Sequence, residues 1–159
     1  MTSLRHAIIS TDGDLTHHDG RLDWPAVIGP EGRARVHLPD LAVTGWVSDC
    51  GLLYPKRYPR NTVGSCVLAA LGARVQPYAG PVVFTGWNPA NTPLGLQEIE
   101  SLPQPVEHLD TVHGDVVKAL AGQTPRAMSA SWAEQIREIA EHARTAPTPG
   151  ITIRTVTLR

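Results

Sequence analysis

Hydrophobic and polar residues alternate over several short stretches in the first half of the chain. Such alternation is typical of strands with one buried face, and it predicts strands over residues 4–10, 34–38 and 41–47. Residues 82–87 instead form a continuous apolar run rich in β-branched side chains, which predicts a central strand buried on both faces. Residues 51–54 are a further candidate for a short strand.

Helical start and stop signals mark four other stretches. They predict a short helix over 22–28, a buried helix over about 61–71, a helix over 106–120 that Gly114 is expected to fray or break, and a C-terminal helix over about 132–144. Asn61 is a good N-cap residue for the buried helix, and Gly72 supplies its end. Gly64 is a poor helix former within it, so we expect this glycine to allow close approach to a sheet. Ser131 and Glu134 have capping-box spacing at the start of the last helix.

The order of these elements predicts an α+β fold. A mostly antiparallel sheet would carry the 61–71 helix on one face, and the C-terminal helix would cover more of the sheet. Parallel pairing of the central strand is an alternative. A length of 159 residues fits one domain, with a core over 1–93 and a helical extension over 94–159 as a finer division. The β-prone run at 151–158 is expected to form an edge strand or to pair with a second copy of the chain.

The composition is that of an ordinary globular protein. Hydrophobic residues make up 42% of the chain and charged residues 18%, which excludes a disordered chain or a coiled coil as the default. Because the net charge is only -1, binding to nucleic acid would need a local basic patch. The bases comprise 12 Arg and only 2 Lys, which indicates a GC-rich source more than a binding mechanism.

Membrane and export signals are not evident in the sequence. No apolar run reaches the ~18 residues that a transmembrane helix needs, and the first residues lack a signal-peptide pattern. The two cysteines, Cys50 and Cys66, do not form a C-x-x-C pair, so we expect reduced thiols. These observations predict a cytoplasmic protein without a membrane partner.

The histidines are the first candidates for a metal site. His17 and His18 are adjacent in the segment 12–20, which has the pattern of a solvated hairpin, and adjacent side chains on a strand point to opposite sides. His108 and His113 are five residues apart and would lie on different faces of a helix. No zinc-binding motif includes these residues, so we expect no metal site.

The motifs of nucleophilic and nucleotide chemistry are incomplete. Ser65 lacks the second glycine of a G-x-S-x-G elbow, and Cys50 has no neighbouring cation to activate it. Cys66 lies in an apolar run and is expected to be inert. Neither a Walker A sequence nor a G-x-G-x-x-G fingerprint occurs. The sequence therefore predicts no catalytic residue and no cofactor, and it favours a protein that is not an enzyme.

One cluster has a physical mechanism for binding. Three cations and two aromatic residues lie directly before the buried helix, together with its N-cap residue: Tyr54, Lys56, Arg57, Tyr58, Arg60 and Asn61. A helix N-terminus has free N–H groups, so with Arg57 and Arg60 it could hold a phosphate or carboxylate. Tyrosine and arginine could also stack on single-stranded nucleic acid. The ordinary alternative is a solvated loop whose tyrosines pack on the domain.

Tryptophans are the other prominent aromatic feature. They fall on four different predicted elements, at Trp24, Trp46, Trp87 and Trp132. This distribution favours packing in the core over an exposed stripe, with one or two tryptophans at an interface.

Two short segments carry a family resemblance, residues 61–65 (NTVGS) and residues 80–86 (GPVVFTG). With the opening strand, its Asp12-Gly13 turn and the helix near 22–29, the chain resembles an uncharacterised family of small proteins from actinobacteria, phages and plasmids, over roughly residues 4–87. The resemblance implies an α+β domain and a link to mobile genetic elements. It provides no catalytic residues that could be carried over.

Two classes of function follow. The first is a non-enzymatic accessory or protein-interaction protein, whose partner is another protein or a second copy and whose contact surface is the 54–60 loop. The alternative is a small phosphate- or nucleic-acid-directed enzyme or binder, which would use Arg57, Arg60 and a histidine brought close by folding.

Overall fold

The computed structural model describes residues 5–20, 22–36, 38, 43–86, 107–122 and 131–145. Five strands form one sheet in the order β2-β1-β5-β4-β3, and all of its pairings are antiparallel. The strands are β1 Arg5–Ile9, β2 Leu15–Asp19, β3 Arg33–Val36, β4 Val43–Ser48 and β5 Val82–Gly86. The central strand is β5, as its apolar run predicts, and the alternative of parallel pairing is not adopted.

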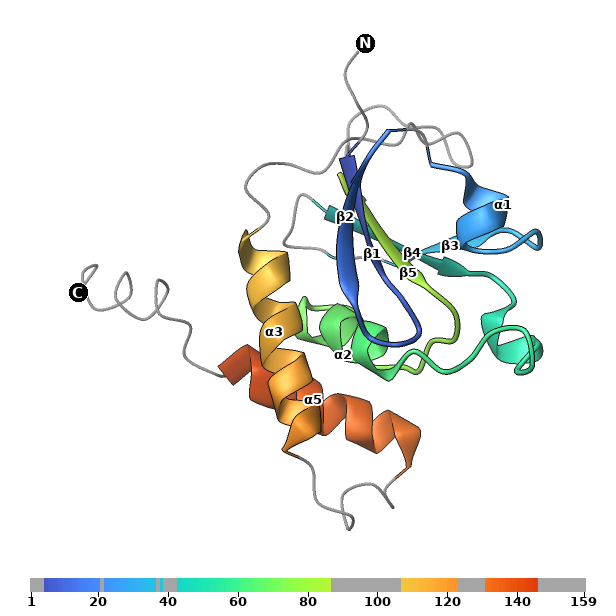
Figure 1. Ribbon diagram of the computed structural model, residues 1–159. Coiled ribbons are helices and arrows are strands. Elements are labelled where there is room, and N and C mark those ends of the chain that lie inside the picture. Colours follow the sequence, from blue (N-terminus) through green and yellow to red (C-terminus); the bar gives the residue numbers. More distant parts are fainter. Residues whose placement is uncertain are drawn as a thin grey trace.

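The helices lie on both sides of this sheet (Figure 1). They are α1 Trp24–Val27, the 3-10 turn η1 Gly51–Leu53, α2 Thr62–Ala70, α3 Glu107–Ala121 and α5 Trp132–Thr145. The helices α2, α3 and α5 gather on one side, whereas α1 lies on the other. The predicted α+β fold is confirmed, including the buried helix near 61–71 and the C-terminal helix near 132–144.

The sheet separates two apolar clusters. On the side of α2, α3 and α5, Phe84 belongs to one cluster with residues from all three of these helices, so the parts of the chain before and after residue 93 share one core. On the α1 side, the smaller cluster joins Val83 to Ile28 and Trp46. Successive residues of β5 thus point into different clusters, which explains why this strand is apolar throughout.

Two details of the predicted elements are wrong. Residues 51–54 do not form a strand, because the Leu53 amide donates to the Cys50 carbonyl oxygen at 3.0 Å and closes η1. The helix predicted over 106–120 is not broken, since α3 continues through Gly114. Burial of Val112 and Val116 in the core outweighs the low helix propensity of one glycine.

Other predictions concern residues outside the described parts of the chain. These are the end of the central strand at Trp87 and the β-prone run at 151–158. Among the described residues, no helix combines the length and apolar character that crossing a membrane requires.

Asn61 connects the sheet to α2. Its side chain is fully buried at 0% exposure. The Oδ1 atom accepts from the Gly64 amide at 2.8 Å and caps α2, whereas Nδ2 donates to the carbonyl oxygens of Ile9 at 3.0 Å and Gly80 at 2.9 Å. One amide group therefore joins the end of β1, the approach to β5 and the start of α2.

Gly64 lets α2 lie close to the sheet, as its position in the sequence predicts. A Cβ atom at this residue would lie 2.7 Å from Cγ2 of Val82 and 2.8 Å from the Asn61 side chain. Real Cβ atoms do not come so close to other atoms, so a larger residue would force α2 away from the sheet.

We expect opposite effects from the same substitution at two helical glycines. Gly64→Ala should lower the free energy of unfolding by about 2 kcal/mol because of the clash with Val82. Gly114→Ala should raise it by about 0.5–1 kcal/mol, since a Cβ atom there meets nothing within 4 Å. Urea unfolding followed by tryptophan fluorescence measures both values, and a neutral Gly64→Ala would contradict the close packing of α2.

Asn61→Asp separates the capping of α2 by Asn61 from the hydrogen bonds that its side chain donates to Ile9 and Gly80. Aspartate is as good an N-cap as asparagine, but its carboxylate cannot donate to the Ile9 and Gly80 carbonyl oxygens. We expect Asn61→Asp to lower the free energy of unfolding by about 3 kcal/mol, as measured by the same urea titration. If this variant is as stable as the parent, the capping bond alone accounts for the contribution of the Asn61 side chain to stability.

Candidate functional site

The segment from η1 to Asn61 contains all the residues predicted to bind, and its backbone is well held. The Arg57 and Tyr58 amides both donate to the Tyr54 carbonyl oxygen, at 3.0 and 2.9 Å. The Gly80 amide donates to the Pro59 carbonyl oxygen at 2.8 Å, and an isolated β-bridge pairs Arg60 with Ala79. The segment is therefore an ordered turn rather than a loose loop.

Arg57 and Tyr58 both engage Glu31, which follows α1. The Arg57 guanidinium donates to Oε1 of Glu31 and the Tyr58 hydroxyl donates to Oε2. The hydrogen bond from Tyr58 and the nearby charge of Arg57 lower the pKa of Glu31 below its usual value of 4.5. In the other direction, the hydrogen bond to Glu31 and burial raise the pKa of Tyr58. Glu31 thus acts as an ionised anchor for the segment.

Tyr58 reaches Glu31 because Gly29 leaves room for it. Gly29 has a φ of 121°, and a Cβ atom there would lie 1.9 Å from the Tyr58 hydroxyl oxygen. The ring of Tyr58 is buried, whereas Tyr54 and Arg57 are exposed next to it. The Arg57 guanidinium lies 5.4 Å from the Tyr54 ring centroid and 6.0 Å from that of Tyr58. These contacts hold the cation at the surface between two aromatic rings.

The structure does not bring Arg57 and Arg60 together on the N-terminus of α2. Arg57 is bonded to Glu31, whereas the Arg60 guanidinium lies 4.6 Å from the ring centroid of Trp132 in α5. The Asn61 side chain is buried and caps the helix from inside. Of the predicted binding residues, Tyr54, Lys56, Arg57 and Arg60 remain exposed to a ligand, and Lys56 lies on the turn between Tyr54 and Arg57.

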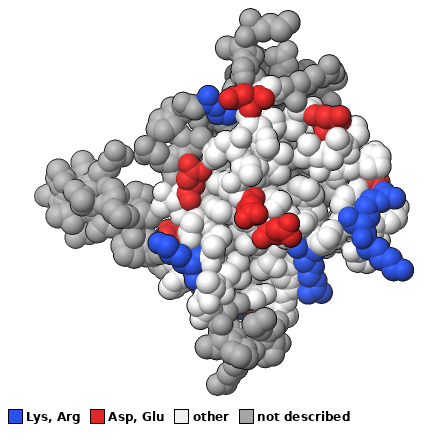
Figure 2. Space-filling view, viewed as in Figure 1, with Lys and Arg blue, Asp and Glu red and all other residues white. Residues whose placement is uncertain are grey.

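Figure 2 shows how charge is distributed around this segment on the face seen in Figure 1. Acidic and basic residues are interspersed over most of the described surface in this view. Basic side chains project at the right-hand edge, where Figure 1 places the segment that follows β4. Lys56 and Arg57 belong to that segment.

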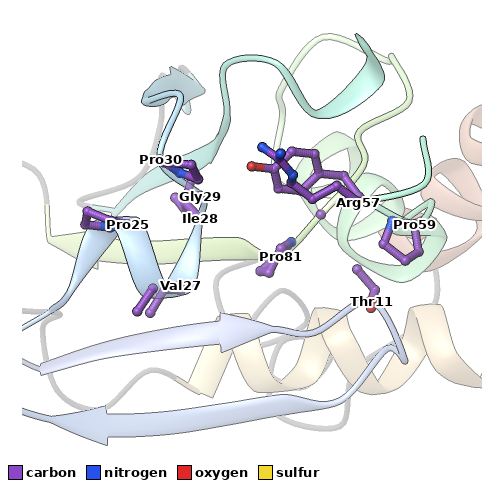
Figure 3. Close-up of a pocket in the computed structure, with 12 residues that line it drawn as sticks. Thr11, Pro25, Val27, Ile28, Gly29, Pro30, Arg57, Pro59 and Pro81 are labelled. Atoms are coloured by element: carbon purple, nitrogen blue, oxygen red, sulfur yellow. The ribbon is translucent and has the colours of Figure 1, made fainter. Parts of the chain in front are cut away.

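A cleft of about 380 Å³ opens between α1 and the 57–59 turn. Residues 25–30 form one wall, Arg57 and Pro59 the other, and Pro81 lies between them (Figure 3). Four prolines contribute to its lining, at positions 25, 30, 59 and 81. Arg57 alone is charged among the described residues that line the cleft. The cleft is therefore a rigid, largely apolar groove with one cation.

A second hollow of about 280 Å³ lies beside η1. Residues 51–53 and 76–79 form its rim, and Ala34 and Val47 of the sheet contribute to its lining. Leu52, Leu53 and Tyr54 follow one another here with 59, 72 and 47% of their surface exposed. We name these three residues the η1 patch. Val75, close to this rim in sequence, is a further exposed hydrophobic residue.

The histidines contact neighbouring elements of the fold. His17 Nε2 is hydrogen-bonded to Oδ1 of Asp110 in α3 at 2.7 Å, whereas His18 stacks on His6 with 5.3 Å between ring centroids. The adjacent pair thus points to opposite sides of β2, as predicted. His113 Nε2 is hydrogen-bonded to the Gly13 carbonyl oxygen at 2.7 Å. Within the described ranges, no three His, Cys, Asp or Glu side chains cluster as metal ligands would.

Ser65 is hydrogen-bonded within the fold, and Cys66 is buried in the core. The Ser65 hydroxyl donates to the Asn61 carbonyl oxygen at 2.7 Å and accepts from the Tyr78 amide at 2.9 Å. Burial raises the pKa of Cys66 to about 12, so its thiol stays protonated and unreactive at neutral pH. Cys50 is half-buried, and both cysteines are free.

Sequence reasoning missed two parts of this site. It did not connect Glu31 with Arg57 and Tyr58, because no local pattern links residues so far apart in the chain. It also assigned Leu52 and Leu53 to a strand, although two adjacent leucines before a proline-rich turn could have suggested an exposed apolar corner. The tryptophan prediction holds in part, since Trp46 is buried in the core.

The lowered pKa of Glu31 predicts a pH-dependent contribution to stability. The folded state favours the carboxylate, so the contribution is present above pH 4.5 and is lost as the pH falls through the lower pKa of the folded protein. Glu31→Gln should therefore unfold at lower urea than the parent near pH 7, and the two midpoints should converge as the pH falls through the lowered pKa of Glu31. A gap that stays constant with pH would contradict the role of the ionised carboxylate.

The chain was compared with known proteins at the level of sequence and of structure. No family model, no curated protein and no solved structure matches the chain. The resemblance over residues 4–87 therefore stays a prediction, and the function must be inferred from the geometry of the site.

Proposed function

We propose that this chain is a non-enzymatic interaction protein, which binds a partner protein through the η1 patch. The observation that carries the proposal is the succession of Leu52, Leu53 and Tyr54, all large, hydrophobic and exposed, of which the two leucines line a hollow. When a partner covers exposed apolar side chains, their removal from water stabilises the complex by about 25 cal/mol for each Å² buried.

The backbone beneath the η1 patch supports this proposal. The Leu53 amide is bonded to Cys50 and the Arg57 amide to Tyr54, both at 3.0 Å, so the exposed side chains project from a fixed frame. A surface that is already ordered loses little conformational entropy when it binds. Tyr54 adds a rigid aromatic ring, the kind of side chain that anchors many protein interfaces.

The proposed setting is the cytoplasm, in association with a mobile genetic element, as the resemblance over residues 4–87 implies. The free thiols of Cys50 and Cys66 are compatible with a reducing compartment. The hydrogen bonds that engage Ser65 and His113 within the fold favour a binding role over a catalytic one.

A peptide-display selection tests the η1 patch. Immobilised parent protein should enrich peptides with a shared apolar anchor from a random library. A double variant, Leu52→Ser with Leu53→Ser, should bind synthetic versions of these peptides about tenfold more weakly or worse. Fluorescence anisotropy with labelled peptides measures the dissociation constants.

Val117→Ser is the matched control for this experiment. Val117 is also an exposed hydrophobic residue, but it lies on α3, away from η1 (Figure 1). This variant should bind like the parent, and urea midpoints should show that all the proteins are folded. Equal binding by the parent and the double variant would refute the η1 patch as the contact surface.

A further inference from the structure

The proline-lined cleft and the hollow beside η1 border the same stretch of chain. Residues 76–79 line the hollow, and Gly80 and Pro81 line the cleft. Residues 51–53 also line the hollow and residues 57–59 line the cleft, so the exposed residues 54–56 join the two depressions along the chain. An extended partner segment anchored on the η1 patch would therefore meet Arg57 and the cleft as it continued along the exposed residues 54–57.

The cleft offers such a segment one charge and several apolar rings. Arg57 is the charged residue among its described lining, and it stands at one wall opposite Pro30 and Ile28 (Figure 3). The neighbouring Lys56 is exposed and adds a second positive charge on the same turn. An acidic segment is thus the electrostatic complement of this wall.

Arg57 could exchange its bond to Glu31 for a bond to a partner's carboxylate. A guanidinium has five N–H donors, and the ion pair to Glu31 uses one terminal nitrogen of Arg57 while 57% of the side chain stays exposed. The Glu31 carboxylate is held separately by the Tyr58 hydroxyl. Glu31 would therefore remain in position if Arg57 turned towards a second carboxylate.

We propose that the cleft is an acidic-residue subsite of the partner-binding surface, in which an Asp or Glu of the partner bonds to Arg57 in competition with Glu31. The proposal rests on the proposed function, because it names the chemistry of the segment that the η1 patch anchors. Proline rings at positions 25, 30, 59 and 81 provide rigid contacts for the apolar atoms next to that carboxylate. Glu31 competes for Arg57, so an Asp or Glu of the partner must bind Arg57 strongly enough to displace it.

Competition predicts opposite effects from the two halves of the ion pair. Glu31→Gln leaves Arg57 without its internal carboxylate, so binding of an acidic peptide should become about twofold tighter. Arg57→Gln removes the cation, so the same peptide should bind about two- to fivefold more weakly. If the ion pair only maintained the shape of the surface, both substitutions would weaken binding.

The experiment uses a peptide enriched on the η1 patch, synthesised in two forms that differ by Glu or Gln at one position. The parent and Glu31→Gln proteins should prefer the Glu form, whereas Arg57→Gln should bind both forms equally. Arg137→Gln is the matched control, since it removes an exposed arginine on α5 and should leave the preference intact. Affinities are measured by anisotropy at low and high salt, and the preference should shrink in salt.

The outcomes separate this subsite from the proposed function. If the parent binds the Glu and Gln forms equally while the Leu52 and Leu53 substitutions still abolish binding, the subsite is refuted and the η1 patch stands. A weaker interaction of Glu31→Gln with the Glu form would also refute competition. If the library yields no peptide that depends on the η1 patch, both proposals fail.

Discussion

The side chain of Asn61 is fully buried where β1 ends, the chain enters β5 and α2 begins, and it bonds to all three. In this buried position water cannot replace a missing partner, and each unpaired polar group costs about 1–3 kcal/mol. The geometry of the amide therefore fixes the distance between the sheet and α2. Gly64 makes the same approach sterically possible, because any side chain there would collide with Val82.

A second set of hydrogen bonds extends this junction to the candidate surface. The backbone N–H of Asn61 donates to the Tyr78 carbonyl oxygen at 3.0 Å, and the Ser65 hydroxyl accepts from the backbone N–H of Tyr78 at 2.9 Å. These bonds hold residues 78–81 against the first turn of α2. Because Tyr78 and Ala79 line the hollow and Gly80 and Pro81 line the cleft, the surface proposed for binding is built on this hydrogen-bonded junction.

The internal capping of α2 also decides which chemistry remains at the surface. With Asn61 satisfying the helix from inside, Arg57 and Arg60 are engaged by Glu31 and Trp132 instead of converging on the helix N-terminus. What faces solvent is an apolar corner beside a cation that is shared with an internal acid. Such a combination suits a partner segment read by both hydrophobic contact and charge.

The sequence by itself determined the elements whose signals are local. The N-cap at Asn61, the capping box at Ser131 and the apolar run of β5 each depend on neighbours within a few residues, so their patterns can be read directly. The predicted break at Gly114 did not occur, because the burial of one face of α3 outweighs the low helix propensity of a single glycine. Local patterns do not include that tertiary contribution.

Only the tertiary structure decided the composition of the site. Glu31 meets Arg57 and Tyr58 from 26 and 27 positions away, because the sheet places the turn after α1 beside the turn before α2. The Asn61 amide finds the Ile9 carbonyl oxygen across 52 positions for the same reason. Which distant groups meet depends on strand order and on the packing of helices over the sheet, and residue spacing along the chain carries no direct record of either.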